Sequence, residues 1–187
     1  MANYHVEDLW AEVPLSELRQ NCVDVAKFLD CCKLCPNYNK VWSCPPYSFD
    51  PQQIWNSYES LTLCCRKVVF SDEARAVSYP QEELGVISKK LMQMEQDALL
   101  EVMMEKEKLH RGSMALAAGS CSACAPLACA RLDGQRCRHP EKIRYSLESL
   151  GGDVGKIIEE QFGLKMLWAE GGHLPEYFLL VGGLLHN

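Results

Sequence analysis

The sequence predicts a mixed α/β domain in which a mixed sheet is flanked by helices and carries two cysteine-rich metal-binding loops. Segments with apolar residues at helical spacing alternate with segments rich in strand-forming residues. Cysteines and prolines gather in two loop-like stretches between these segments. A length of 187 residues fits one domain, so we expect residues 1–187 to form a single cysteine-rich metal-binding domain.

The N-terminal part is expected to contain a strand, a helix and a loop. Residues 4–13 fit a first strand. Residues 16–30 fit a helix with Ser16 as its N-cap, because apolar residues recur there at helical spacing. Prolines then mark residues 32–51 as a loop, the first cysteine loop. They are Pro36, Pro45, Pro46 and Pro51.

The middle of the chain is predicted to contain a strand and a long helix. A short helix over residues 52–60 leads into a strand over residues 61–70, which is rich in strand-forming residues at its end. Pro80 opens a helix that runs to about His110, and Gly112 is its expected stop. At 1.5 Å per residue this helix would be roughly 45 Å long, which leaves room for a break.

The C-terminal part is predicted to contain a second cysteine loop, a helix and a hairpin. The second cysteine loop covers residues 119–144. Asp153 is the expected N-cap of a helix that Gly163 ends. Residues 164–169 and 177–185 fit the two strands of a terminal hairpin.

The composition argues against several classes of protein. The net charge is −6, so the basic footprint of a nucleic-acid binder is absent from the sequence. No apolar run approaches the roughly 20 residues of a membrane span, and the first ten residues lack the basic region of a signal peptide. The sequence has no Walker loop and no dinucleotide fingerprint, which argues against nucleotide or nicotinamide chemistry.

Eleven cysteines are the unusual feature of the composition. Disulfide scaffolds reach such a density in short secreted chains, but this chain is longer, has an odd number of cysteines and shows no export signal. We therefore expect a cytoplasmic protein in a reducing compartment, where clustered cysteines usually bind metal.

The second cysteine loop has the spacing C-x2-C-x4-C-x7-C, formed by Cys121, Cys124, Cys129 and Cys137. Four thiolates close in sequence can surround one centre, either zinc or an iron–sulfur cluster. Zinc sites typically pair two C-x2-C elements, whereas this loop contains one. The spacing therefore favours a [4Fe–4S] cluster, with zinc as the alternative.

Two features flank these cysteines. Residues 112–120 are rich in small side chains, which suit either close approach to a bulky cofactor or a tight helix end. Residues 131–144 contain five basic and two acidic side chains, a local charge of +3 that would stabilise an anionic cluster or bind an anionic ligand. Arg136, Arg138 and His139 are the candidate cofactor contacts, with a solvated basic loop and a structural histidine as the competing interpretation.

The first cysteine loop offers three well-spaced thiolates, Cys32, Cys35 and Cys44. The last two are each followed by proline, which fixes the backbone after a ligand, and the pair Pro45–Pro46 is a candidate for a cis peptide bond. Three ligands suit a second iron–sulfur cluster with one open iron, able to bind a substrate.

A fourth ligand of the first loop is not evident from the spacing. Cys31 adjoins Cys32, while Cys64 and Cys65 point to opposite sides of a predicted strand, so at most one of these two would reach the loop. A rival arrangement is one zinc site shared between the two loops. Its ligands would be Cys32, Cys35, Cys121 and Cys124.

The stretches CPNYNKVWSCPPYSFDP and CSACAPLACARLDGQRCRHPEKIRYSLESLGGDV carry motifs that can be compared with known families. The positions concerned are Cys35, Pro36, Tyr38, Lys40, Cys44, Pro45 and Pro46, then Cys137, Arg138, His139, Pro140, Glu141, Ser146, Glu148, Gly151, Asp153 and Val154. They resemble a cysteine-rich family of predicted metal-binding proteins, a domain of unknown function common in anaerobic bacteria and archaea. Asn39, Leu147 and Gly152 depart from its usual pattern. The resemblance covers about residues 30 to 185 and implies metal or cluster binding, without a reaction.

These observations favour an iron–sulfur protein with one or two [4Fe–4S] clusters. We expect it to act in electron transfer or in cluster-based chemistry on a small sulfur-containing or anionic substrate, with a redox partner protein or that small molecule as its partner. The alternative is a zinc-stabilised binding module with no catalytic activity. The sequence does not decide whether the protein is an enzyme.

Overall fold

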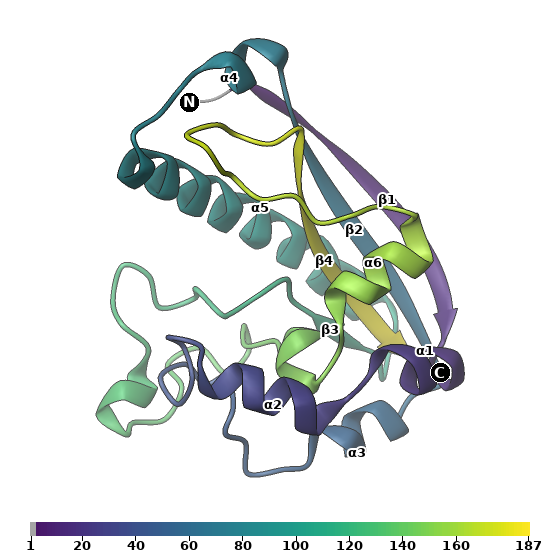
Figure 1. Ribbon diagram of the computed structural model, residues 1–187. Coiled ribbons are helices and arrows are strands. Elements are labelled where there is room, and N and C mark those ends of the chain that lie inside the picture. The colour runs from purple at the N-terminus through teal and green to yellow at the C-terminus, as the bar shows by residue number, and fades with distance from the viewer. Residues whose placement is uncertain (1–2) are drawn as a thin grey trace.

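A four-stranded sheet forms the centre of the structure, a computed structural model that describes residues 3–187 (Figure 1). The strands are β1 Tyr4–Pro14, β2 Ser60–Phe70, β3 Met114–Leu116 and β4 Tyr177–His186. Their order in the sheet is β1-β2-β4-β3. The mixed α/β class is confirmed. The expectation that the sheet itself is mixed is wrong, because every pair of these strands is antiparallel.

Helices cover both faces of this sheet. Within the described residues they are α1 Leu15–Cys22, α2 Val25–Lys33, α3 Pro51–Asn56, α4 Asp72–Ala76, α5 Gln81–Leu109 and α6 Val154–Phe162. Two short 3-10 turns are η1 Ala130–Asp133 and η2 Glu148–Leu150. Helix α5 packs on one face of the sheet, and α1 and α6 pack on the other (Figure 1).

The two faces bury different side chains because neighbouring strand residues point in opposite directions. Cys65 of β2 belongs to the core that contains Leu18 of α1 and Ile157 of α6. Cys64, the preceding residue, belongs to the core that contains Leu99 of α5. The opposite orientations predicted for these two cysteines are therefore confirmed.

The predicted helix over residues 16–30 is wrong as a single element, because the chain leaves the helix before Asp24. The Asp24 N–H donates to the Gly151 carbonyl at 2.9 Å, and the Asp153 N–H donates to the Cys22 carbonyl at 2.7 Å. These two hydrogen bonds join segments that are far apart in the sequence. The Asp24 side chain then caps the separate helix α2.

The other predicted ends of helices and strands agree with the structure to different degrees. The predicted strands over residues 4–13 and 61–70 agree with β1 and β2 within one residue at each end. The short helix predicted over residues 52–60 is α3 and ends at Asn56. Helix α1 begins one residue before Ser16 and has no side-chain cap, so the predicted N-cap is wrong.

Helix α5 follows Pro80 as predicted and is 29 residues long without a break. Helix α6 has the predicted ends, since Asp153 accepts a hydrogen bond from the Lys156 N–H and Gly163 adopts a positive φ of 64°. No described helix is long and apolar enough to cross a membrane.

The predicted terminal hairpin is wrong. Residues 177–185 lie in β4, but residues 164–169 form no strand. Strand β4 pairs with β2 on one side and with β3 on the other, and the sequence pattern did not predict the three-residue β3. The segment after α6 instead approaches the start of α5, where the Tyr79 N–H donates to the Gly172 carbonyl at 2.8 Å.

A buried arginine ties α5 to the sheet. The guanidinium of Arg66 in β2 donates two hydrogen bonds of 2.8 Å to Asp8 in β1. It also lies 3.4 Å from Glu95 in α5, and the Tyr4 hydroxyl donates to Glu95 at 2.8 Å. Because the Arg66 side chain is only 9% exposed, loss of this cation would leave two poorly solvated carboxylates without their partner.

We therefore expect Arg66→Leu to lower the free energy of unfolding by about 3–5 kcal/mol, the usual cost of breaking a buried ion pair. Urea unfolding followed by circular dichroism measures the change. The control is Arg75→Leu, which removes an exposed pair with Asp72 and should cost less than about 1 kcal/mol. Equal losses in the two variants would contradict a structural role of the Arg66 network.

Candidate metal centre

The two cysteine loops lie against each other at the C-terminal end of α2 (Figure 1). Arg131 in η1 joins them, because its guanidinium donates to three carbonyl oxygens of the first loop. The acceptors are Val41 at 2.9 Å, Cys44 at 2.5 Å and Pro46 at 2.6 Å. The same guanidinium lies 4.9 Å from the centre of the Trp42 ring. One cation of the second loop therefore holds the backbone around Cys44.

Further hydrogen bonds connect the loops. The buried Ser43 hydroxyl accepts from the Cys121 N–H at 3.0 Å, and its oxygen lies 4.0 Å from the sulfur of Cys44. The Trp42 indole N–H donates to the Gln135 carbonyl at 3.0 Å. Ser43 thus stands between a candidate ligand of the first loop and one of the second.

The second cysteine loop is also attached to α5 near both of its ends. The Ser122 hydroxyl donates to Asp97 at 2.5 Å. At the other end, Arg144 forms an ion pair with Glu107, whose carboxylate also accepts from the Ala115 N–H at 2.8 Å. A long, regular helix therefore supports a loop that has little regular structure of its own.

The small residues before the second loop contribute to packing. Ala115, Ala117 and Ala118 are buried. Gly119 has a positive φ of 83°, and a Cβ at this position would lie 2.8 Å from the amide nitrogen of Gln96 in α5. The small residues thus allow this segment to pack closely against α5, a role that neither interpretation of residues 112–120 named.

All four cysteines of the second loop line one cavity of about 210 Å³. They are Cys121, Cys124, Cys129 and Cys137. Trp42 of the first loop and Gln93 of α5 form part of its wall. Burial raises the pKa of Cys121, the Ala123 N–H opposes this shift, and the other three thiols add to it. The structure thus brings together the four residues that the spacing predicted as one ligand set.

The arrangement of these thiols can be compared with the size of the group that they would hold. Four sulfurs at 2.3 Å from one zinc ion would lie only about 3.8 Å from one another. Within residues 3–187, no three Cys, His, Asp or Glu side chains converge closely enough to hold a single ion. The four thiols nevertheless share one cavity. A donor set of four thiols suits either group that the spacing allows, zinc or an iron–sulfur cluster.

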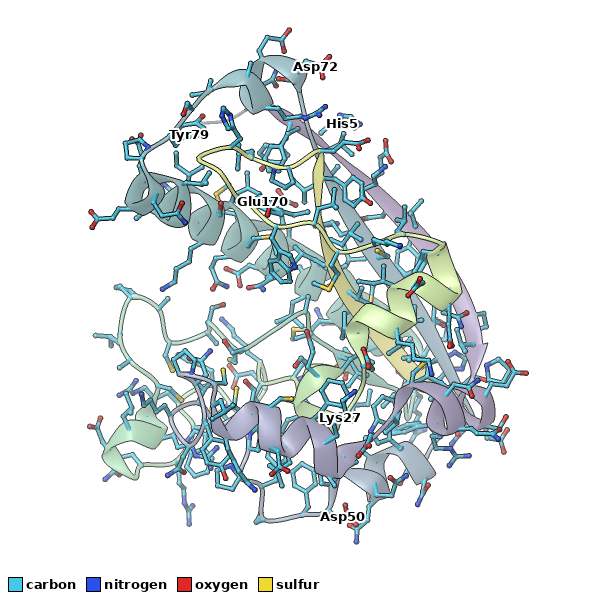
Figure 2. The ribbon with its side chains drawn as sticks, viewed as in Figure 1. His5, Lys27, Asp50, Asp72, Tyr79 and Glu170 are labelled. Atoms are coloured by element: carbon cyan, nitrogen blue, oxygen red, sulfur yellow. The ribbon has the colours of Figure 1, made fainter. Side chains whose placement is uncertain are left out.

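The first loop brings Cys32, Cys35 and Cys44 together as a second set of thiols. Burial raises the pKa of Cys44 to about 11, with Ser43 opposing the shift, the other two thiols adding to it and Arg131 opposing it. In Figure 2, sulfur atoms gather to the left of the labelled Lys27, where α2 meets the cysteine loops. Burial, with a smaller contribution from the neighbouring thiols, favours the protonated form of Cys44, which a bound cation would reverse.

The cysteines outside these two sets have other environments, although all eleven are free thiols. Cys22 is in the core, as predicted, and its thiol donates to Glu160 at 3.2 Å. Cys64 and Cys65 are fully buried in the sheet, and burial raises the pKa of each to about 12. Neither can close the first site. Among the cysteines, this leaves Cys31 as the candidate fourth ligand of the first site; it adjoins Cys32 and is exposed.

The rival zinc site shared between the loops gains no support from this arrangement. The thiols that influence Cys44 are those of its own loop, Cys35 and Cys32. Those that influence Cys121 are likewise those of the second loop. The four cysteines of the second loop line one cavity and no cysteine of the first loop does, which favours two sets over one site shared between the loops.

The three residues proposed as cofactor contacts lie on the outer part of the second loop. Arg136 and Arg138 are exposed, and Arg138 donates to the Ala128 carbonyl at 2.7 Å. His139 lies 3.8 Å from Glu141. None of the three is among the residues that line the cavity. Cofactor contact by these side chains remains a prediction.

Sequence reasoning missed the residues that position the cysteines. Arg131 appeared only as one of five basic residues, and nothing in the local pattern distinguished it from Arg136. Ser43 carried no signal apart from its place before Cys44. Both act through contacts between loops about 90 residues apart in the chain.

Thiol labelling can test this division of the cysteines. In metal-free, reduced protein, we expect iodoacetamide to modify Cys31 and Cys35 first, because both are exposed. Cys22, Cys64 and Cys65 should stay unmodified until the protein unfolds, since each is buried and has a pKa raised to about 12. Peptide mass spectrometry gives the order, and early labelling of the core cysteines would contradict the two-set arrangement.

Comparison with known proteins gives one result. No curated protein and no solved structure matches this chain. The family described as "Predicted metal-binding protein (DUF2284)" matches residues 18–185, which include every cysteine. The resemblance seen in the sequence motifs is thereby confirmed over a longer stretch than those motifs covered. The chain belongs to this family of predicted metal-binding proteins, whose function is unknown.

Proposed function

We propose that this protein is an iron–sulfur protein with a [4Fe–4S] cluster in its second cysteine loop. The ligands would be Cys121, Cys124, Cys129 and Cys137. One observation carries the proposal: all four thiols of the second loop line a single cavity. A [4Fe–4S] cluster takes four cysteine thiolates, one at each iron, and so suits a set of four thiols around one cavity.

The first loop would hold a second cluster through Cys32, Cys35 and Cys44. Arg131 supports this assignment, since its positive charge lies near Cys44 and favours the thiolate form. Ser43 contacts both Cys44 and Cys121, so the two sites would be neighbours. Neighbouring clusters suit electron transfer from one to the other.

A bound cluster would supply one-electron chemistry, while the protein would control access and charge. Trp42 and Val41 line the second-loop cavity and would shield it from water. The chemistry would take place in a reducing, cytoplasmic environment. The partner would be a redox protein or a small sulfur-containing or anionic substrate, attracted by the local excess of basic residues.

Metal analysis of protein purified without oxygen tests the proposal directly. We expect about four irons and four acid-labile sulfides per occupied cluster, with a brown colour. Occupation of both loops would give about eight irons per chain. Stoichiometric zinc with no iron would overturn the proposal and favour a zinc-stabilised module.

Replacement of single cysteines tests the assignment of ligands. Cys129→Ser should reduce the iron content by about four atoms per chain or convert the cluster, because a serine hydroxyl is a poor substitute for a thiolate ligand. The matched control is Cys22→Ser, which changes a core cysteine that should not bind metal. Iron and sulfide counts measure both. Full iron content in both variants would show that the second loop is wrongly assigned.

A further inference from the structure

Glu148 carries an unusual buried oxygen. Among the described residues, only two buried side-chain oxygens lack a hydrogen-bond partner, Oγ of Ser88 and Oε2 of Glu148. The Glu148 oxygen belongs to a carboxyl group whose burial raises its pKa, while its own backbone N–H and Ser146 oppose the shift, so the charged form is costly here. Within residues 3–187 this carboxylate also forms no ion pair. A cation near Glu148 would remove the cost.

The fold places Glu148 beside the thiols of the first loop. It begins η2, which packs directly on α2, the helix that carries Cys32. The approach is close enough that a Cβ on Gly151, just after η2, would lie 2.7 Å from Cα of Val25. Burial raises the pKa of Cys32, and the neighbouring Cys35 and Glu148 raise it further.

Tyr47 lies beside both the first loop and the η2 turn. Its hydroxyl donates to the Ser43 carbonyl at 2.7 Å, next to Cys44. Burial raises the pKa of Tyr47, Ser149 opposes that shift, and the Cys44 and Cys32 thiols add to it. Tyr47 also lines one cavity with Ser149, which adjoins Glu148, so the η2 turn and the backbone next to Cys44 meet at this tyrosine.

We infer that Glu148 is the fourth ligand of the first-loop metal site, where its carboxylate binds the iron that Cys32, Cys35 and Cys44 leave open. The inference rests on the proposed function, because it assumes that this loop holds a cluster. Thiolates are softer ligands than carboxylates and compete well for iron–sulfur centres. A small thiolate would therefore replace Glu148 at that iron, with one Fe–S bond formed, one Fe–O bond broken and no change of oxidation state.

This exchange identifies a class of substrate. A site closed by four cysteines has no position for a small molecule, whereas a carboxylate can leave when a thiolate arrives. The first-loop site would thus bind small thiol compounds. Cys31 is the competing fourth ligand, but its side chain is exposed on α2 and does not account for the unpartnered carboxylate.

The test uses the full chain, prepared without oxygen as wild type, Glu148→Gln, Glu148→Cys, Cys31→Ser and the surface control Glu159→Gln. Each is titrated with 2-mercaptoethanol and followed by absorption and electron paramagnetic resonance spectra. Glu148→Gln removes the competing ligand, so the thiol concentration for half-maximal change should fall by about tenfold or more. Glu148→Cys should keep its iron and lose the response, and Glu159→Gln should behave as wild type.

The outcomes separate this inference from the proposed function. Absence of iron from every preparation would overturn both. Iron at the wild-type level, with Glu148→Gln titrating as wild type, would overturn the inference alone. A change in the response that appears only in Cys31→Ser would assign the fourth ligand to Cys31. If Glu148→Gln loses the iron of the first site and Glu148→Cys retains it, Glu148 acts as a ligand. If both variants lose this iron, Glu148 has only a structural role.

Discussion

The guanidinium of Arg131 connects the two halves of the candidate metal centre. The first cysteine loop has little regular structure, so its carbonyl groups lack the partners that a helix or sheet would provide. Arg131 supplies hydrogen bonds to three of them and stacks on Trp42. Arg131 therefore fixes the backbone beside Cys44, and the Ser43–Cys121 and Trp42–Gln135 hydrogen bonds add to the contact between the two loops.

The centre is in turn anchored to elements that the sheet makes rigid. Helix α5 is tied to β1 and β2 through the buried Arg66 network and holds the second loop through Asp97 and Glu107. Helix α2 is fixed where Asp24 bonds to the segment that follows η2. These attachments bring together ligands from distant parts of the chain. They also place η2, and with it Glu148, next to the first loop.

The two sets of thiols lie in different environments, and we propose different roles for them. With the proposed cluster bound, the four cysteines of the second loop would serve storage and transfer of electrons. The first loop has three cysteines, and its proposed fourth ligand, Glu148, has one buried oxygen without a hydrogen-bond partner, so this site would serve exchange of a small ligand. Metal binding would also displace protons from these thiols and reduce their mutual repulsion, so occupation of the sites would be coupled to order in the loops.

Local sequence signals by themselves determined the elements that depend on neighbouring residues. These include β1, β2, α5 after Pro80, the caps of α6, and the cysteine spacing that defines both thiol sets. Tertiary structure decided the remainder: the break before Asp24, the pairing of β3 with β4, and the roles of Arg131 and Glu148. Apolar periodicity, caps and ligand spacing act over a few residues and are readable in one chain. Hydrogen bonds between segments about 90 to 130 residues apart leave no local pattern, and only the folded chain shows which arginine bonds to the backbone beside Cys44.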